Sequence, residues 1–182
     1  YPYYDIAMID FVRKIGEDNI TIVTVGDNMS RLLEFKAGRN TINACGKMSI
    51  RKTLSILEGA DLVIGTDTGV MHGSGCYEVP KILLLSATTE ENVSKYWKNC
   101  INLSADDIFC QPCHRLTYFY EDCPSNEDYG FKEVYGVRIP ICMSRLPSSK
   151  VTNAILKVYK NKMEGKCVST EVARNTTLTI TG

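Results

Sequence analysis

A short apolar run that ends in small and polar residues constrains the fold of this chain most. The run is Leu62–Ile64, the break follows at Gly65 and Asp67, and a helix-like segment begins directly afterwards. This pattern is typical of a buried strand that leads into the N-terminus of a helix. Ligands of open α/β sheets bind beyond the carboxyl ends of the strands, and unpaired N–H groups at a helix start attract anions. We therefore expect the chemistry of the chain at this break.

Further periodic segments extend this unit into a longer pattern. Apolar spacing predicts helices over residues 5–16, 29–36, 49–59, 68–77 and 90–98 and strands over residues 20–25, 62–64 and 82–85. Strands and helices alternate through about residue 104, which predicts an α/β fold with a doubly wound, mostly parallel sheet. We expect one domain over residues 1–160, with an irregular cysteine-containing insertion at 105–145, a terminal helix near Val151 and Ile155, and a polar tail at 161–182.

Composition and charge exclude several classes of protein. The 182 residues are 44% hydrophobic and 23% charged, and their formal net charge is zero. A neutral chain is not expected to bind nucleic acid, because that binding rests on neutralised phosphates. No apolar run approaches the roughly 18 residues of a membrane span, and the first residues do not resemble a signal peptide. We expect a cytoplasmic protein, with two alternatives for the basic segment 132–166: a solvated face or peripheral contact with an anionic inner membrane.

The residues after the central strand are candidates for anion binding. We expect Asp67 at or near the N-cap of the following helix, with the N–H groups of Thr68 and Gly69 facing a ligand. His72 lies four residues after Thr68, on the same helix face, where its imidazole could donate to a diphosphate. The alternative is structural: Asp67 only caps, the glycines only allow packing against the sheet, and His72 is satisfied elsewhere. Spacing alone leaves both open.

The wider context resembles a known family. The stretch Ala60–His72, the segment Lys47-Met48-Ser49-Ile50 before it, and the motifs Cys110-Gln-Pro-Cys113, Cys123-Pro124 and Cys142-Met143 after it occur in this order. Together they resemble the C-terminal domain of glycosyltransferase family 9, the ADP-heptose:lipopolysaccharide heptosyltransferases and their relatives. The resemblance implies a Rossmann-like domain that forms the C-terminal half of a GT-B fold, in which two such domains enclose a cleft.

The resemblance also implies roles for particular residues. Asp67, Thr68, Gly69 and His72 fall on positions that bind the nucleotide-sugar donor around its diphosphate and sugar, Met48 falls near the adenine pocket, and Thr88 matches the threonine of a donor-binding loop. That loop reads Ser86-Ala87-Thr88-Thr89-Glu90 here, without the Gly-Pro and final Pro of the family.

The resemblance implies an ADP-heptose-like donor, a lipopolysaccharide or related lipid-linked glycan as acceptor, and no cofactor. The family's general base lies in an N-terminal acceptor domain, which this stretch does not include. We expect the chain by itself to bind donor weakly and not to turn over. The alternative is a non-catalytic nucleotide-binding or interaction module that shares the fold and is stabilised by a metal.

The four clustered cysteines leave three states open. Cys110, Cys113, Cys123 and Cys142 could form a tetrahedral metal site, remain as structural thiols, or pair as disulfides. His114 is an alternative ligand beside Cys113. We expect reduced thiols without a metal, because the second pair of cysteines does not have Cys-x-x-Cys spacing.

Overall fold

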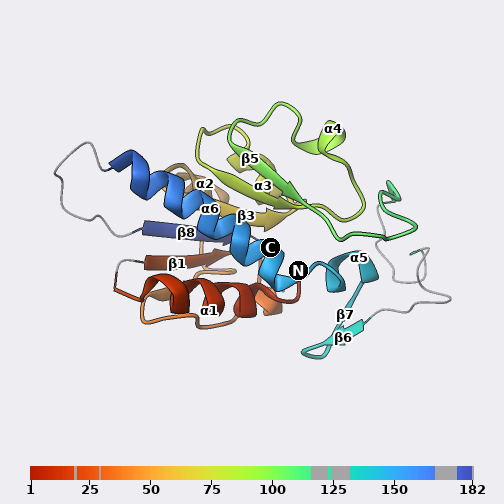
Figure 1. The fold of residues 1–182 in the computed structure, drawn as a ribbon, viewed down its shortest axis with the longest axis horizontal. Coiled ribbons are helices and arrows are strands. Elements are labelled where there is room, and N and C mark those ends of the chain that lie inside the picture. The colour runs from red at the N-terminus through yellow and green to blue at the C-terminus, as the bar shows by residue number, and fades with distance from the viewer. Residues whose placement is uncertain (19, 29, 116–122, 124–131, 167–175, 182) are drawn as a thin grey trace.

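A computed structural model describes the chain except for residues 19, 29, 116–122, 124–131, 167–175 and 182 (Figure 1). The helices are α1 (Tyr4–Ile15), α2 (Ile50–Glu58), α3 (Gly69–Ser74), α4 (Glu90–Val93), α5 (Ile141–Ser144) and α6 (Ser148–Lys166), with a 3-10 turn η1 (Arg31–Leu33). The strands are β1 (Ile20–Val25), β2 (Thr41–Asn43), β3 (Leu62–Thr66), β4 (Lys81–Leu84), β5 (Cys100–Leu103), β6 (Lys132–Val134), β7 (Val137–Ile139) and β8 (Thr176–Thr181).

Six strands form one parallel sheet in the order β2-β1-β8-β3-β4-β5, and every neighbouring pair in it is parallel. The chain moves outward from the centre in one direction through β1 and β2 and in the other through β3, β4 and β5. The predicted doubly wound α/β sheet is therefore confirmed. Because the strands run in the same direction, the residues that follow them meet at one edge of the sheet, the carboxyl edge.

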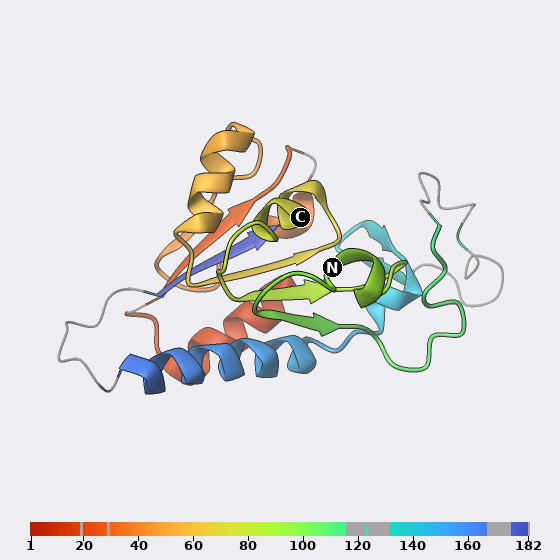
Figure 2. The same cartoon turned by 90° about the horizontal axis from the view of Figure 1, so that it is seen from above.

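Helices cover both faces of the sheet, as Figure 2 shows, with α1 and α6 on one side and α2 on the other. Alternate side chains of β3 divide between two cores: Leu62 and Ile64 pack with α1 and α6, whereas Val63 packs with Leu57 of α2 and Met71 of α3. A strand that is covered on both faces must be apolar at successive positions, which explains the continuous apolar runs in the sequence.

Local sequence signals set the ends of the longer helices. Ser49 precedes α2 in an extended conformation, and its Oγ accepts a hydrogen bond from the Lys52 amide at 3.4 Å. α1 ends at Gly16, whose φ of 87° suits a residue without a Cβ. Both ends agree with the sequence-based expectation. The expected helix near residue 33 is shorter, a single 3-10 turn.

The C-terminal segment differs from the polar tail expected over residues 161–182. α6 continues to Lys166, and β8 lies at the centre of the sheet between β1 and β3. Thr179, Ile180 and Thr181 are each 0% exposed. Threonine is polar but β-branched, and it suits a pleated, buried strand.

The insertion expected to be irregular over residues 105–145 contains regular structure in its described part. β6 and β7 form an antiparallel hairpin whose turn residues Tyr135 and Gly136 have φ of 54° and 72°. Two successive positive φ values belong to the turns that match the twist of a hairpin. The Tyr135 hydroxyl donates to Asp5 Oδ2 at 2.7 Å, which attaches the hairpin to the start of α1.

One charged side chain lies inside the sheet. Lys81 is 0% exposed, and its Nζ donates to the carbonyl oxygens of Tyr77, Val79 and Lys98 at 2.7, 2.6 and 3.1 Å. Burial lowers the pKa of this ammonium group. Because three carbonyl acceptors match its three N–H donors, Lys81 has a structural role and holds together the loops at the amino edge of the sheet.

Candidate functional site

Asp67, the first residue after β3, connects two segments at the carboxyl edge. Its Oδ1 lies 2.8 Å from His72 Nε2, and its Oδ2 accepts a hydrogen bond from Thr88 Oγ1 at 2.9 Å. The side chain of Asp67 is 24% exposed and that of His72 is 50% exposed, so the cluster is open to solvent on one side. Three residues predicted for donor binding are thereby brought together from β3, α3 and the loop after β4.

The cap of α3 differs from the expectation. Thr68, not Asp67, is the N-cap: it has an extended conformation (φ −139°, ψ 160°), and its Oγ1 accepts from the Met71 amide at 3.5 Å. The hydroxyl of Thr68 takes the capping position because it directly precedes the first helical residue. The Asp67 carboxylate is thereby left to join His72 to Thr88.

The orientation of His72 is set from two sides. A carboxylate can only accept, so the Nε2 that faces Asp67 carries the proton, and Nδ1 is the second nitrogen of the ring. The ring also packs edge-on against Trp97, with ring centroids 5.4 Å apart and an interplanar angle of 87°. Nδ1 can donate to an anion only when the imidazole is protonated.

The glycines of α3 have separate functions. A Cβ at Gly69 would meet no atom within 4 Å, so this residue faces open space where a ligand can approach the backbone. A Cβ at Gly73 would instead overlap Leu54 of α2. The tight packing expected between the glycine face and the sheet is therefore a contact between two helices.

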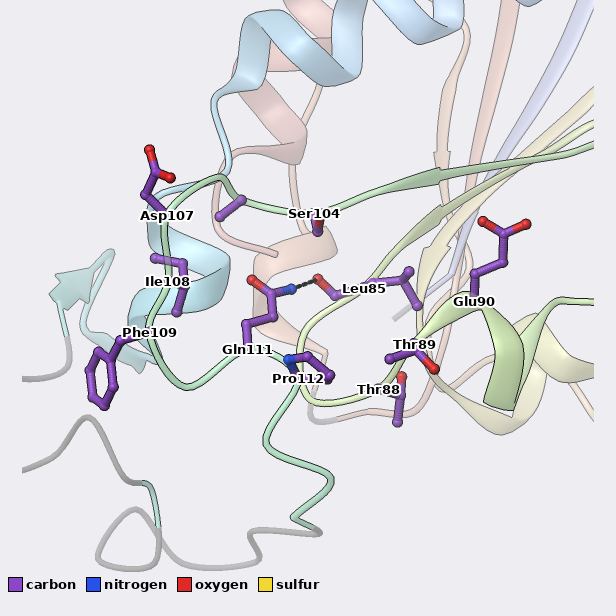
Figure 3. Close-up of a pocket in the computed structure, with 11 residues that line it drawn as sticks. Leu85, Thr88, Thr89, Glu90, Ser104, Asp107, Ile108, Phe109, Gln111 and Pro112 are labelled. Carbon is purple, nitrogen blue, oxygen red and sulfur yellow. Dashed lines mark hydrogen bonds between the residues drawn. The ribbon is translucent and has the colours of Figure 1, made fainter.

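A cavity of about 540 Å³ lies beside this cluster, beyond the ends of β4 and β5 (Figure 3). Its lining comes from the loop after β4 (Leu85, Thr88, Thr89, Glu90) and the segment after β5 (Ser104, Ala105, Asp107, Ile108, Phe109, Gln111, Pro112). Thr88 belongs to both the cavity and the Asp67 cluster, so the two are continuous.

The cavity wall is held by hydrogen bonds between its two segments. Gln111 Nε2 donates to the Leu85 carbonyl at 3.0 Å, and the His114 amide donates to the Ala87 carbonyl at 2.7 Å. The His114 ring lies 3.3 Å from the Asn92 amide nitrogen, measured from Nδ1 to Nδ2. The Cys110–Cys113 segment therefore forms part of the site, through Gln111 and Pro112.

Met48 lies apart from these groups. It is 36% exposed in the turn between β2 and α2. Its turn follows the carboxyl end of β2, on the same edge as Asp67, but β2 and β3 are three strand spacings apart, or about 14 Å. A small anion could not touch both residues, whereas an extended ligand could.

Comparisons with known proteins assign the family. The model of "Glycosyltransferase family 9 (heptosyltransferase)" matches residues 13–122. The chain belongs to glycosyltransferase family 9. The protein named "Lipopolysaccharide heptosyltransferase 1" from Pseudomonas aeruginosa (strain PAO1) is 25% identical over 119 residues, which are 65% of this chain and 32% of that protein. This family 9 chain therefore spans about a third of its curated relative. No solved structure matches it.

The family match includes Met48, the Asp67 cluster and Thr88, and it extends through Cys113. None of the seven cysteines in the described residues forms a disulfide, and Cys167 lies outside those residues. Among the described residues, no three His, Cys, Asp or Glu side chains are arranged to hold a metal. Burial raises the pKa of the Cys142 thiol to about 11, and the nearby Cys123, Cys110 and Cys113 add to the shift.

Among the residues of the candidate site that sequence reasoning missed are Trp97 and Gln111. Trp97, which packs against His72, lies 25 positions away in the sequence and is the one tryptophan of the chain. Gln111 lies inside the cysteine motif, where attention falls on the thiols. A single tryptophan and a glutamine between two cysteines were the available signals, but neither specifies a contact with α3 or with the loop after β4.

Proposed function

We propose that this chain binds the nucleotide-sugar donor of a glycosyltransferase that transfers a heptose-like sugar to lipopolysaccharide or a related glycan. The observation that carries the proposal is the contact of Asp67 with both His72 and Thr88 at the carboxyl edge of the sheet. Membership of glycosyltransferase family 9 supports the reaction class, and the relative named for lipopolysaccharide supports the acceptor class.

The geometry suggests how a donor would lie. The open side of Gly69 and the amides at the start of α3 suit the diphosphate, and a protonated His72 adds a donor from the same helix face. Met48 on the far side of the edge suits the flat apolar surface of adenine. Asp67 then acts as a positioning residue: it fixes the His72 ring and the Thr88 loop on either side of the donor.

Transfer to an acceptor needs a group that removes a proton from the attacking hydroxyl. Asp67 is an unsuitable base, because both its oxygens already have partners. We propose that the base lies in an N-terminal acceptor domain, in keeping with the fraction of the relative that this chain spans. A protonated His72 and the amides at the start of α3 would stabilise the leaving diphosphate.

We propose that the reaction takes place in the cytoplasm and that the acceptor is a lipid-linked glycan at the inner membrane. No helix in the described residues is long and apolar enough to cross a membrane. Two lysines of the basic segment pair within the chain, Lys150 with Asp106 and Lys162 with Asp61. These pairs favour the solvated-face alternative over strong electrostatic binding to anionic lipid.

Titration of ADP and an ADP-sugar by calorimetry tests the proposal. We expect Asp67→Ala to weaken both ligands at least tenfold, because His72 and Thr88 lose the group that orients them. The matched control is Asp18→Ala, an exposed aspartate between α1 and β1 at the opposite edge of the sheet. Equal binding by wild type and Asp67→Ala would refute the proposed donor site.

A further inference from the structure

The cavity beyond β4 and β5 has its own chemistry, distinct from that of the Asp67 cluster. We propose that it binds a neutral sugar unit and excludes the phosphates of the donor. This inference rests on the proposed function, because it names the part of the substrates that this side of the site accepts. Thr88 lines the cavity and donates to Asp67, so the sugar would lie next to the diphosphate.

The charge of the lining argues against an anionic ligand. Within the part of the chain that the structure describes, the eleven lining residues include two carboxylates, Glu90 and Asp107, and no lysine, arginine or histidine. A phosphate in this cavity would meet two negative charges, and the ammonium group of Lys150, which donates to the Ser104 carbonyl at 2.9 Å, is already paired with Asp106. Carboxylates are acceptors, and the hydroxyl groups of a sugar are donors that satisfy them without bringing charge.

The remaining lining matches the two kinds of surface that a sugar presents. Thr88, Thr89 and Ser104 supply hydroxyl groups, and the apolar atoms of Leu85, Ala105, Ile108 and Pro112 supply surface for C–H groups. Ligand sites generally combine an apolar lining with a few placed polar groups. Figure 3 shows Gln111 and Pro112 at the point where the segment after β5 meets the Leu85–Thr88 part of the loop after β4.

The cavity wall is also fixed before any ligand binds. The contacts of Gln111 with Leu85 and of His114 with Ala87 join its two segments. Gln111 Oε1 is buried and has no hydrogen-bond partner among the described residues. Because this oxygen is buried within the wall, it is not part of the surface that a ligand in the cavity would meet.

The sugar could belong to the donor or to the acceptor, and a comparison of ligands that carry one or the other distinguishes the two. We would titrate ADP, ADP-heptose and deacylated lipopolysaccharide core oligosaccharide against the whole chain and its variants. Glu90→Gln removes a lining charge, and Glu91→Gln is its matched control, because Glu91 is exposed on the same helix and does not line the cavity. Asp107→Asn removes the second lining charge, and asparagine, like aspartate, tolerates the φ of 57° at this position. Ser104→Leu partly fills the cavity.

We expect Glu90→Gln, Asp107→Asn and Ser104→Leu to weaken one sugar-containing ligand about five- to tenfold while ADP binds as in wild type. Loss confined to ADP-heptose assigns the cavity to the donor sugar, and loss confined to the oligosaccharide assigns it to the acceptor. Unchanged binding of both sugars, or an equal loss for ADP, would overturn the inference. Asp67→Ala judges the proposed function separately, since it acts on ADP itself. Thermal unfolding of each variant identifies any that fail to fold.

Discussion

At the scale of single residues, the site depends on which side chain performs which local task. Thr68 caps α3, and this releases the carboxylate of Asp67 to connect His72 with Thr88. The proximity of Asp67 to His72 follows from a separation of five residues and was predictable from the sequence. The contact with Thr88 was not, because it depends on β3 and β4 being neighbours in the sheet.

Removal of the Thr88 hydroxyl tests this connection. Thr88→Val preserves the shape of the side chain and removes the hydrogen bond to Asp67 Oδ2, so we expect ADP-sugar binding to weaken about three- to tenfold. The matched control is Thr21→Val, since Thr21 is a half-buried threonine of β1 that belongs neither to the Asp67 cluster nor to the cavity lining. Calorimetric titration provides the measurement, and equal affinities for the two variants would contradict the assignment of Thr88.

The thiol of Cys142 provides a pH-dependent prediction. Burial and nearby cysteines raise its pKa from 9.0 to about 11, so the thiolate that reacts with iodoacetamide is scarce at pH 8. We expect Cys142 to be alkylated more slowly than the exposed Cys76 at pH 8, and its rate to rise up to about pH 11. Mass spectrometry of peptides from briefly treated native protein measures both rates.

The same shift has a consequence for stability. The folded chain keeps the Cys142 proton to a higher pH than the unfolded chain, so the unfolded state binds fewer protons between pH 9 and about 11. The contribution of this thiol to the free energy of unfolding is therefore present below pH 9 and falls as the pH rises through that window. A Cys142→Ser variant that shows the wild-type pH dependence would contradict this account.

At the scale of elements, α1, β1 and α2 could be predicted because periodicity, capping and burial agree in their sequences. β8 could not be predicted from composition, because four of its six residues are threonine, which suggests a polar tail but also suits a buried strand. Its alternation of Thr177, Leu178, Thr179 and Ile180 was the overlooked signal. The hairpin β6–β7 was missed for another reason: its short strands carry charged and half-buried side chains with little periodicity.

A charge in β8 tests its central place. Ile180 is 0% exposed and packs in the core with α1 and α6, so Ile180→Asp would bury an unpaired carboxylate and destabilise the chain by about 3 kcal/mol or more. The control is Ile50→Asp, because Ile50 is 58% exposed at the start of α2. Urea unfolding measures both. Comparable stability of the two variants would show that β8 does not lie inside the sheet.

At the scale of the whole molecule, the family and the sheet were predictable from the order of the motifs. The division of the reaction between this donor-binding chain and a separate acceptor domain was inferred from the family alone. The chain spans 32% of its relative, and both oxygens of the Asp67 carboxylate already have partners. We therefore expect the chain to bind ADP-heptose but to show no transfer to an acceptor lipid by itself. A coupled assay for released ADP tests this expectation, and turnover above the background of Asp67→Ala would contradict it.

β8 is the last element in the sequence, but it lies at the centre of the sheet, between β1 and β3. β8 ends at the carboxyl edge where α1 begins, and the Tyr4 hydroxyl donates to the Thr181 carbonyl at 3.4 Å. Figure 1 shows the marked N and C ends close together. β8, α1 and β1 therefore have the arrangement of a β–α–β unit whose first connection is open, which makes the fold a natural candidate for circular permutation.

A permuted chain in which residues 176–181 precede Tyr1 through a short glycine linker, and which ends after α6, should keep the same sheet. We expect its free energy of unfolding to lie within about 2 kcal/mol of the original, because the buried contacts of β8 are unchanged and a short loop costs little to close. The control carries the same six residues in scrambled order. If the permuted and scrambled chains were equally unstable, β8 would depend on its connection to α6. The sheet would then form only when the central strand follows α6 in the sequence.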